Sequence, residues 1–305
     1  MSDINGAYMN LELYRSFYYT ALHGSISKAS EELYITQPAV SRSIRLLEDT
    51  LGCTLFFRTP KGVKLTQEGE VLYSYISQAF NFITAAEKKI SDIKDLSSGE
   101  IRIGVSDTLC KYYLVPYLKL FNTYYPGISI HVTCPPTPGI ISLLKAGAID
   151  FGIINLPYAD GRLVFKNIME IRDCFVTGEK YRFLANKVQP LKEIAGYPLL
   201  LLEKRSNSRL YIDKYFEDNK TTVKPAFELG NIDLLIHFAK YDFGIACVIR
   251  NFVLDELEKG RLFEIKPVEK IPPRSIGAVW LKDVPLSTAS RELINRLEAQ
   301  EEYEI

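Results

Sequence analysis

The 305-residue sequence lacks the patterns that mark several common classes of enzyme. Its three histidines, His23, His131 and His237, fall in different segments, and no pair has the spacing of metal ligands. The nucleophile elbow Gly-x-Ser-x-Gly, the phosphate-binding P-loop and the dinucleotide fingerprint are also missing from the sequence. We therefore expect a protein that is not an enzyme and that uses no metal and no cofactor.

The cysteines have no metal-binding or redox spacing, and their odd number argues against a complete disulfide framework. The pattern favours reduced and mostly buried thiols, and it gives no support to a redox-sensing cysteine. The five residues are Cys53, Cys110, Cys134, Cys174 and Cys247.

An excess of one charge and a long apolar run are both missing. The formal net charge is zero, so no overall field draws the protein to nucleic acid or to a membrane, and any DNA affinity must be local. No segment is long and apolar enough to span a bilayer, and residues 1–6 do not look like a signal peptide. These features predict a cytoplasmic protein, and its length predicts more than one domain.

The segment from Thr36 to Leu51 is predicted to be a helix with two different faces. Thr36 can cap its N-terminus, Pro38 suits its first turn, and Gly52 follows its last turn. At 100° per residue, one face is apolar and the other is polar and basic. The apolar face comprises Val40, Ile44, Leu47 and Leu51, and the polar face comprises Pro38, Ser41, Arg42 and Arg45.

Residues 25–33 are predicted to form a shorter helix before it, with Ser27 as the expected cap. Two residues separate the helices, which is typical of a helix-turn-helix. In such a pair the second helix enters the major groove, where Arg42 and Arg45 can bond guanine edges. Gln37 and Ser41 can reach bases or phosphates. An ordinary helical hairpin with a solvated basic face is the alternative.

Residues 55–66 are predicted to form two short strands around the turn Pro60-Lys61-Gly62, which is the pattern of a wing. The wing carries Arg58, Lys61 and Lys64. Residues 35–66 contain five basic side chains against two acidic ones, which suits a modest phosphate footprint.

Together these residues resemble the DNA-binding domain of LysR-type transcriptional regulators. The resemblance rests on Ala29, Leu33, Thr36-Gln37-Pro38-Ala39-Val40-Ser41, Leu47-Glu48, Leu51-Gly52, Leu55-Phe56 and Leu65-Thr66-Gln67-Glu68-Gly69, and Met9 resembles the usual start of the family. It implies a winged helix-turn-helix over residues 9–66. The predicted DNA-binding residues are Ser27, Thr36, Gln37, Pro38, Ser41, Arg42, Arg45, Arg58, Lys61 and Lys64.

Residues 67–96 are predicted to form one long helix with an apolar heptad seam. An apolar seam of this kind is expected to pack against a partner helix. The family resemblance implies that this linker helix forms a dimer and that the following domains form a tetramer. Packing of the seam on its own domain is the alternative. The seam comprises Leu72, Ile76, Ala79, Ile83, Ala86, Ile90 and Ile93.

Beyond Ser97-Ser98-Gly99, which we expect to be a hinge, strands alternate with helices in the order of a parallel α/β fold. The predicted strands lie at 101–105, 128–133, 150–154, 175–176, 182–185, 199–202, 223–229, 244–249 and 275–281.

Residues 99–305 resemble the effector-binding half of LysR-type regulators, which is similar to a type 2 periplasmic binding protein. Matching residues include Tyr125-Pro126, Asp150-Phe151-Gly152-Ile153 and Gly244-Ile245-Ala246. The resemblance implies a multidomain α/β chain with two lobes, one from about 99–172 and 273–305 and one from about 173–272. Crossovers are expected near 170–174 and 269–275.

Polar residues follow several predicted strands or precede helices, where ligands bind in open α/β sheets. Each alone could be a simple helix cap. Lys204, Arg205 and Arg209 either assist an anion or form solvated surface, whereas Asp107 argues against a very anionic ligand. The resemblance implies that the effector-binding residues are Ser106, Thr108, Thr137 and Asn155, with Ser206, Asn207 and Asn231 in the second lobe.

The sequence therefore predicts a sequence-specific, DNA-binding transcriptional regulator of the LysR type. Its expected partners are double-stranded operator DNA, a small polar or anionic metabolite and further copies of the chain, with RNA polymerase as a further candidate and no membrane. The alternatives are a DNA-binding regulator whose second half only oligomerises, a solute-binding protein of a transporter and a binding-protein-like enzyme.

Overall fold

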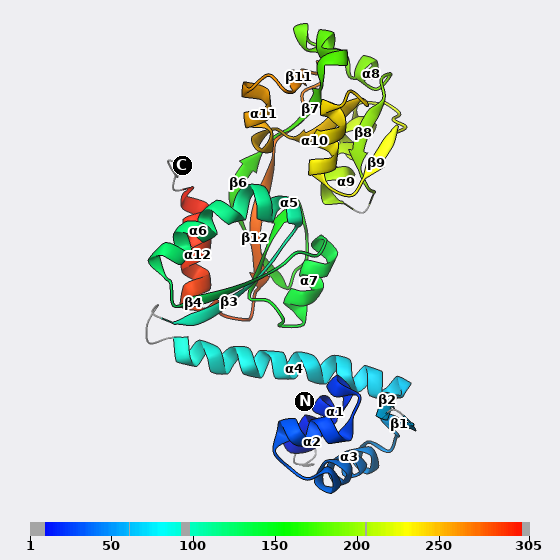
Figure 1. The fold of residues 1–305 in the computed structure, drawn as a ribbon, viewed down its shortest axis with the longest axis vertical. Coiled ribbons are helices and arrows are strands. Elements are labelled where there is room, and N and C mark those ends of the chain that lie inside the picture. Colours follow the sequence, from blue (N-terminus) through cyan, green and yellow to red (C-terminus); the bar gives the residue numbers. More distant parts are fainter. Residues whose placement is uncertain (1–9, 61, 93–97, 205, 301–305) are drawn as a thin grey trace. The chain divides into compact units, whose positions relative to one another are not determined.

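The computed structural model describes residues 10–60, 62–92, 98–204 and 206–300. The chain divides into two compact units between Ala86 and Glu87. Figure 1 labels the helices and strands of both units. The boundaries given above for the two domains, the linker helix and the two lobes remain predictions from the sequence. Some positions that carry predictions lie outside the described residues, namely Lys61, the side chain of Ile90, Ile93, Ser97 and Arg205.

The N-terminal unit packs three helices and a two-stranded antiparallel sheet around one apolar core. Phe17 is fully buried at its centre, and its ring centroid lies 5.3 Å from that of Phe56. The elements are α1 (Leu11–His23), α2 (Ile26–Leu33), α3 (Gln37–Leu51), β1 (Phe56–Thr59) and β2 (Gly62–Leu65). The next helix, α4 (Gln67–Asp92), begins in this unit and continues past its boundary at Ala86.

The start of α2 differs from the prediction that Ser27 is its cap. Ser25 is the cap, and its hydroxyl accepts a hydrogen bond from the Lys28 N–H at 3.4 Å. Gly24 ends α1 in the left-handed conformation (φ 59°), and the chain then enters α2 earlier than a cap at Ser27 would allow. Ser27 is an exposed residue inside the helix.

Helix α4 begins against the N-terminal core. The Thr66 hydroxyl accepts the Gly69 N–H at 2.9 Å and so caps the first turn. Tyr73 and Phe80 then pack against Tyr18 of α1, with centroid distances of 5.7 and 5.2 Å.

The C-terminal unit contains two five-stranded mixed sheets. In the first, which we call lobe I with its helices, β3 pairs in parallel with β4 and β5, whereas β12 pairs antiparallel with β5 and β6. In order across the sheet, the strands are β4 (Ile128–Thr133), β3 (Gly99–Val105), β5 (Phe151–Asn155), β12 (Arg274–Leu281) and β6 (Leu163–Ile171). The helices of lobe I are α5 (Asp107–Leu109), the π-helical turn η1 (Cys110–Leu114), α6 (Val115–Tyr124), α7 (Thr137–Lys145) and α12 (Thr288–Ala299).

The second sheet, which we call lobe II with its helices, has a parallel half and an antiparallel half. Strand β8 pairs in parallel with β9 and β10, and β7 pairs antiparallel with β10 and β11. In order across the sheet, the strands are β11 (Phe263–Ile265), β7 (Asp173–Thr177), β10 (Ile245–Ile249), β8 (Leu199–Leu202) and β9 (Phe227–Leu229). The helices are η2 (Glu179–Asn186), α8 (Leu191–Ile194), α9 (Asn207–Asp218), α10 (Ile232–Lys240), η3 (Arg250–Phe252) and α11 (Leu254–Glu258).

The predicted strand at 182–185 is wrong, because this segment lies inside the 3-10 helix η2. Leu184 is the one buried side chain of η2, so the segment lacks the alternating buried positions of a strand that packs on a core. Strands β6 and β11 were not predicted. Lys166, Asn167 and Glu170 interrupt the apolar pattern of β6, which becomes a strand by pairing with β12 from more than 100 residues further along the chain.

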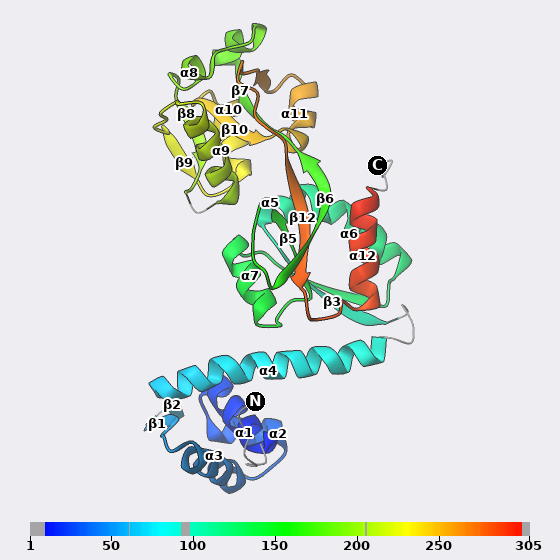
Figure 2. The ribbon, with the colours of Figure 1, turned by 180° about the vertical axis from the view of Figure 1, so that it is seen from behind.

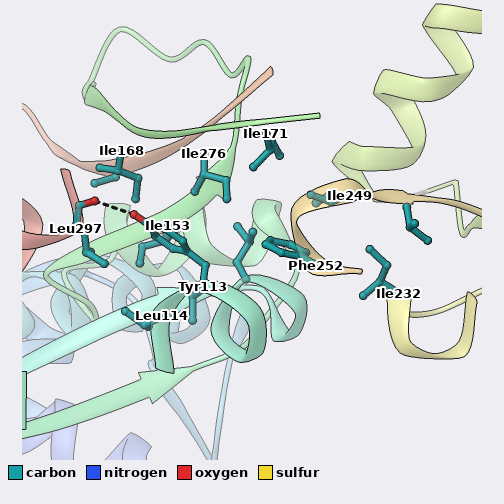
Figure 3. Close-up of a cluster of buried hydrophobic side chains, with 14 of the residues drawn as sticks. Tyr113, Leu114, Ile153, Ile168, Ile171, Ile232, Ile249, Phe252, Ile276 and Leu297 are labelled. Carbon is teal, nitrogen blue, oxygen red and sulfur yellow. Dashed lines mark hydrogen bonds between the residues drawn. The ribbon is translucent and has the colours of Figure 1, made fainter. Parts of the chain in front are cut away.

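One buried apolar cluster continues from lobe I into lobe II (Figure 3). Phe252 of lobe II stacks on Tyr112 of lobe I with ring centroids 5.0 Å apart and ring planes 9° apart. Tyr113 is buried in the same cluster, and its hydroxyl donates to the Leu297 carbonyl oxygen at 2.9 Å.

Strands β6 and β12 run side by side toward lobe II, as the view from behind shows (Figure 2). The segments of the predicted crossovers contain the β6–β7 junction at Arg172 and the start of β12. A buried ion pair joins these places: Arg274 Nε and Nη2 donate to the Asp173 carboxylate at 2.6 and 2.9 Å. Arg274 Nη2 also donates to Ser208 Oγ at 3.0 Å.

Replacing Arg274 with methionine leaves a buried carboxylate without its cation. We expect the free energy of unfolding to fall by about 3–5 kcal/mol, measured by urea denaturation of the full chain. Arg172→Met is the matched control, because Arg172 pairs with Glu170 at the surface, where both side chains are more than half exposed. Its expected loss is below about 1 kcal/mol. Equal losses in the two variants would contradict a structural role for the buried pair.

Candidate DNA interface and ligand cavity

Helix α3 turns a polar face to solvent because most of its apolar face packs into the core, whereas Leu51 at its end is 41% exposed. Val40, Ile44 and Leu47 are buried. As predicted, the Thr36 hydroxyl caps the helix by accepting the Ala39 N–H at 3.4 Å, and Gly52 ends it at φ 70°. The predicted DNA-binding residues of this helix are exposed, apart from half-buried Ser41; they are Gln37, Pro38, Ser41, Arg42 and Arg45.

The wing lies beside α3. Ser41, Arg45 and Arg58 line a groove of about 60 Å³ between the helix and β1. Arg58 and Lys64 are exposed on the two strands of the wing, and neither they nor Arg42 and Arg45 form an ion pair within the described residues. The basic side chains of this face are therefore available to an anion.

Glu48 holds the wing against α3, a role that the sequence reasoning missed. Its Oε1 accepts the N–H groups of Leu55 and Phe56 at 2.7 and 3.4 Å. On the other side of the wing, the Val63 N–H donates to the Gly24 carbonyl at 3.0 Å. The signal was the Leu47-Glu48 pair of the family pattern, but only the fold shows that this acid binds backbone rather than solvent.

A cavity of about 200 Å³ lies between lobes I and II. All seven predicted effector-binding residues line it, although they come from distant parts of the chain. Ser106 and Asn155 follow or end strands β3 and β5, and helices α7, α9 and α10 begin at the cavity. The predicted residues in its wall are Ser106, Thr108, Thr137, Asn155, Ser206, Asn207 and Asn231.

Three of these residues are helix caps. Ser106 Oγ accepts the Leu109 N–H, Ser206 Oγ accepts the Arg209 N–H, and Asn231 Oδ1 accepts the Leu234 N–H. Their main effect is to position the starts of the helices.

Thr137 and Asn155 behave differently. Thr137 is the first residue of α7 rather than its cap; it is 8% exposed, and its hydroxyl has no hydrogen-bond partner among the described residues. Asn155 Oδ1 is buried without a partner in the described part of the chain. A buried polar atom without a partner is costly, so Asn155 Oδ1 is suited to bonding a ligand. The unpartnered Thr137 hydroxyl is suited to the same role because Thr137 also lines the cavity.

The sequence reasoning missed four residues of the cavity wall that come from unrelated segments. Asp173 and Cys247 come from the adjacent antiparallel strands β7 and β10, and Glu203 and Cys134 follow β8 and β4. Burial, with smaller contributions from Cys110 and Asp107, raises the pKa of Cys134 to about 11. Burial also raises the pKa of Cys247 well above its usual value. Both thiols are therefore protonated and weakly reactive near neutral pH.

Arg209, near the start of α9, does not line the cavity. Arg209 is buried, and its guanidinium donates to Asp213, the Leu202 carbonyl and Glu228. The suggestion that Arg209 either assists an anion or is solvated surface is therefore wrong on both counts. Within the described residues, no group of three or more acidic, cysteine or histidine side chains could hold a metal ion.

The described part of the chain has no helix that is both long and apolar enough to cross a membrane.

Two family models match this chain. One, described as bacterial regulatory helix-turn-helix protein, lysR family, matches residues 11–70, and the other, described as LysR substrate binding domain, matches residues 94–301. The RuBisCO operon transcriptional regulator of Allochromatium vinosum is 24% identical over 267 residues, which cover 88% of each protein. The HTH-type transcriptional regulator CbbR of Rhodospirillum rubrum is 28% identical over 252 residues, which cover 83% of each protein.

Solved structures share the fold. A full-length variant of OxyR from Pseudomonas aeruginosa has a TM-score of 0.72 at 18% identity, covering 96% of this chain and 95% of that one. Full-length CbnR, in a structure described as complexed with the target DNA, has a TM-score of 0.65 at 16% identity, covering 95% of this chain and all of that one. The predicted fold class, a winged helix-turn-helix followed by a two-lobed α/β unit, is confirmed. Because the family models match most of its length, the chain belongs to the LysR family of bacterial transcriptional regulators.

Proposed function

We propose that this transcriptional regulator binds operator DNA as a dimer through α3 and the wing, and responds to a small polar metabolite in the cavity between its lobes. The observation that carries the proposal is the convergence of all seven predicted polar residues on one cavity. Thr137 and Asn155 support it further, because they present groups without partners among the described residues to that cavity.

On DNA, the N-terminus of α3 would enter the major groove. Arg42 and Arg45 would read base edges, because arginine bonds guanine bidentately. Thr36, Gln37, Pro38 and Ser41 would contact bases or phosphates near the helix start, and Ser27 of α2 would contact the backbone. Arg58, Lys61 and Lys64 of the wing would add phosphate contacts, which makes binding strongly dependent on salt.

Truncation of an arginine that reads a base should reduce specific binding. We expect Arg42→Ala or Arg45→Ala to lose about 1–3 kcal/mol for an operator selected from random DNA, measured by fluorescence anisotropy. Lys64→Ala is the comparison, because loss of a phosphate contact should weaken binding to all sequences alike and reduce the salt slope by about 1. Unchanged operator affinity in both arginine variants would rule out the assignment.

The exposed part of the heptad seam on α4 supports a dimer. Leu72 packs partly against the N-terminal core, but Ala79, Ile83 and Ala86 are exposed, with Ile83 at 42%. An apolar stripe of this kind is stabilised when a second helix covers it. A dimer would present two DNA-binding domains to two half-sites of one operator. Assembly of two dimers into a tetramer, and contact with RNA polymerase, remain further predictions.

Ile83→Asp places a charge in the centre of the proposed seam, and we expect it to shift the protein from dimer to monomer in sedimentation velocity. Thr84→Asp is the control, because its exposed side chain is adjacent in sequence but outside the heptad positions. Sedimentation of Ile83→Asp as the native assembly would count against the seam.

Ligand binding would act through the relative position of the lobes. Lys111 and Tyr112 of lobe I bond the Asp233 carboxylate of lobe II at 2.6 and 2.5 Å. A ligand that bonds both lobes favours the arrangement in which it makes more contacts, and its effect is limited by its difference in affinity for the two states. The changed arrangement would alter half-site spacing or DNA bending.

Thr137→Val removes a hydroxyl from the cavity and keeps the shape of the side chain. We expect a metabolite that raises the unfolding temperature of the wild-type protein to lose most of this effect in the variant, in a thermal-shift screen. A ligand at about 100 times its dissociation constant stabilises by about 2.7 kcal/mol, which such a screen detects. Thr123→Val, on the exposed face of α6, is the control. If no compound shows a shift that depends on Thr137, the alternative in which the second half only oligomerises gains support.

A further inference from the structure

Three hydrogen-bond acceptors of the cavity wall are not paired with a basic side chain among the described residues. The carboxylates of Asp107 and Glu203 line the cavity, are exposed and form no ion pair within the described part of the chain. Glu203 Oε1 lies beside Gly230, another residue of the cavity wall. Asn155 Oδ1 is buried and accepts no hydrogen bond from the described residues. These three groups suit a ligand that donates hydrogen bonds and carries positive charge.

The third carboxylate of the wall is already neutralised. Asp173 is paired with Arg274, which approaches it from outside the cavity wall. None of the described residues that line the cavity is a lysine, an arginine or a histidine. A ligand with only negative charge would therefore meet the uncompensated field of Asp107 and Glu203.

Other groups of the cavity wall donate hydrogen bonds and favour negative charge. Thr137 is only 8% exposed and lines the cavity, and its hydroxyl has no hydrogen-bond partner among the described residues, so it can donate to a ligand. Helices α9 and α10 begin at the cavity, and the first N–H groups of a helix have no partner within the helix. Their dipoles favour negative charge, so this part of the wall suits a carboxylate.

We propose that the ligand is a zwitterion, an amino carboxylic acid whose ammonium group is bound by Asp107, Glu203 and Asn155. Its carboxylate would be bound by Thr137 and by the starts of α9 and α10. The inference rests on the proposed function, in which this cavity is the effector site. The cavity volume of about 200 Å³ is somewhat above the roughly 150 Å³ that admits a benzene ring, which suits a molecule of amino-acid size.

The experiment is isothermal titration of the full chain with the protein amino acids, each used alone. The amino acid that binds most tightly is then compared with its 2-hydroxy acid, which lacks the ammonium group, and with its amine, which lacks the carboxylate. We expect both analogues to bind at least about tenfold more weakly, because each leaves one set of groups in the cavity without a partner.

Variants separate the two ends of the ligand. Asp107→Asn and Glu203→Gln should weaken binding of the amino acid by about three- to tenfold. They should not weaken binding of the 2-hydroxy acid, because its carboxylate is repelled by Asp107 and Glu203 in the wild type. Glu217→Gln is the matched control, because this carboxylate is exposed on α9 and does not line the cavity. Thr137→Val should weaken both the amino acid and the 2-hydroxy acid.

The inference is overturned if no amino acid binds, if the 2-hydroxy acid binds as tightly as the amino acid, or if both acidic variants bind like the wild type. If the protein instead binds a carboxylic acid that has no amino group, and this binding depends on Thr137, the ligand is not a zwitterion but the cavity is still the effector site. If the affinity for the ligand is the same in Thr137→Val, Asp107→Asn and Glu203→Gln as in the wild type, the ligand binds outside the cavity. This result would overturn the proposed function as well.

Discussion

The ion pair between Asp173 and Arg274 is the interaction on which the C-terminal unit depends most directly. These residues begin β7 and β12, the strands at which the chain passes between the two sheets. Because both charges are buried, each is stable only in the presence of the other. The pair also reaches the cavity, since Asp173 and the Ser208 hydroxyl that Arg274 bonds both line it. The joint between the lobes and the cavity wall therefore share the same residues.

The N-terminal unit uses an acidic residue for a similar purpose. Glu48 binds the backbone of Leu55 and Phe56 and so fixes the wing beside α3, which brings Arg45 and Arg58 to the same groove. A carboxylate that bonds backbone N–H groups does not neutralise its basic neighbours by direct ion pairing. The local excess of basic side chains on this face thus remains available, although the net charge of the chain is zero.

The cavity differs in chemistry from the face formed by α3 and the wing, and in the proposed function the two bind different partners. The face of α3 and the wing offers exposed cations, which suit a polyanion whose counterions are released on binding. The cavity offers hydroxyl, amide and carboxylate groups held by caps and strands, and no cation among the described residues that line it. Fixed groups of this kind lose little conformational freedom on binding, so they favour a small ligand of defined shape.

The sequence by itself determined the elements whose signals are local. Thr36, Pro38 and Gly52 mark the ends of α3, and the order of strands and helices predicted an α/β fold, because caps and hydrophobic periodicity depend on neighbours within one or two turns. With the family resemblance, it also identified the polar residues of the cavity. Only the tertiary structure decided that Gly24 shifts the cap of α2 to Ser25, that β6 is a strand and that 182–185 is not. Only the fold brought Asp173, Glu203 and Cys247 to the cavity and turned Arg209 away from it, because these outcomes depend on contacts between residues far apart in the chain, which no local pattern records.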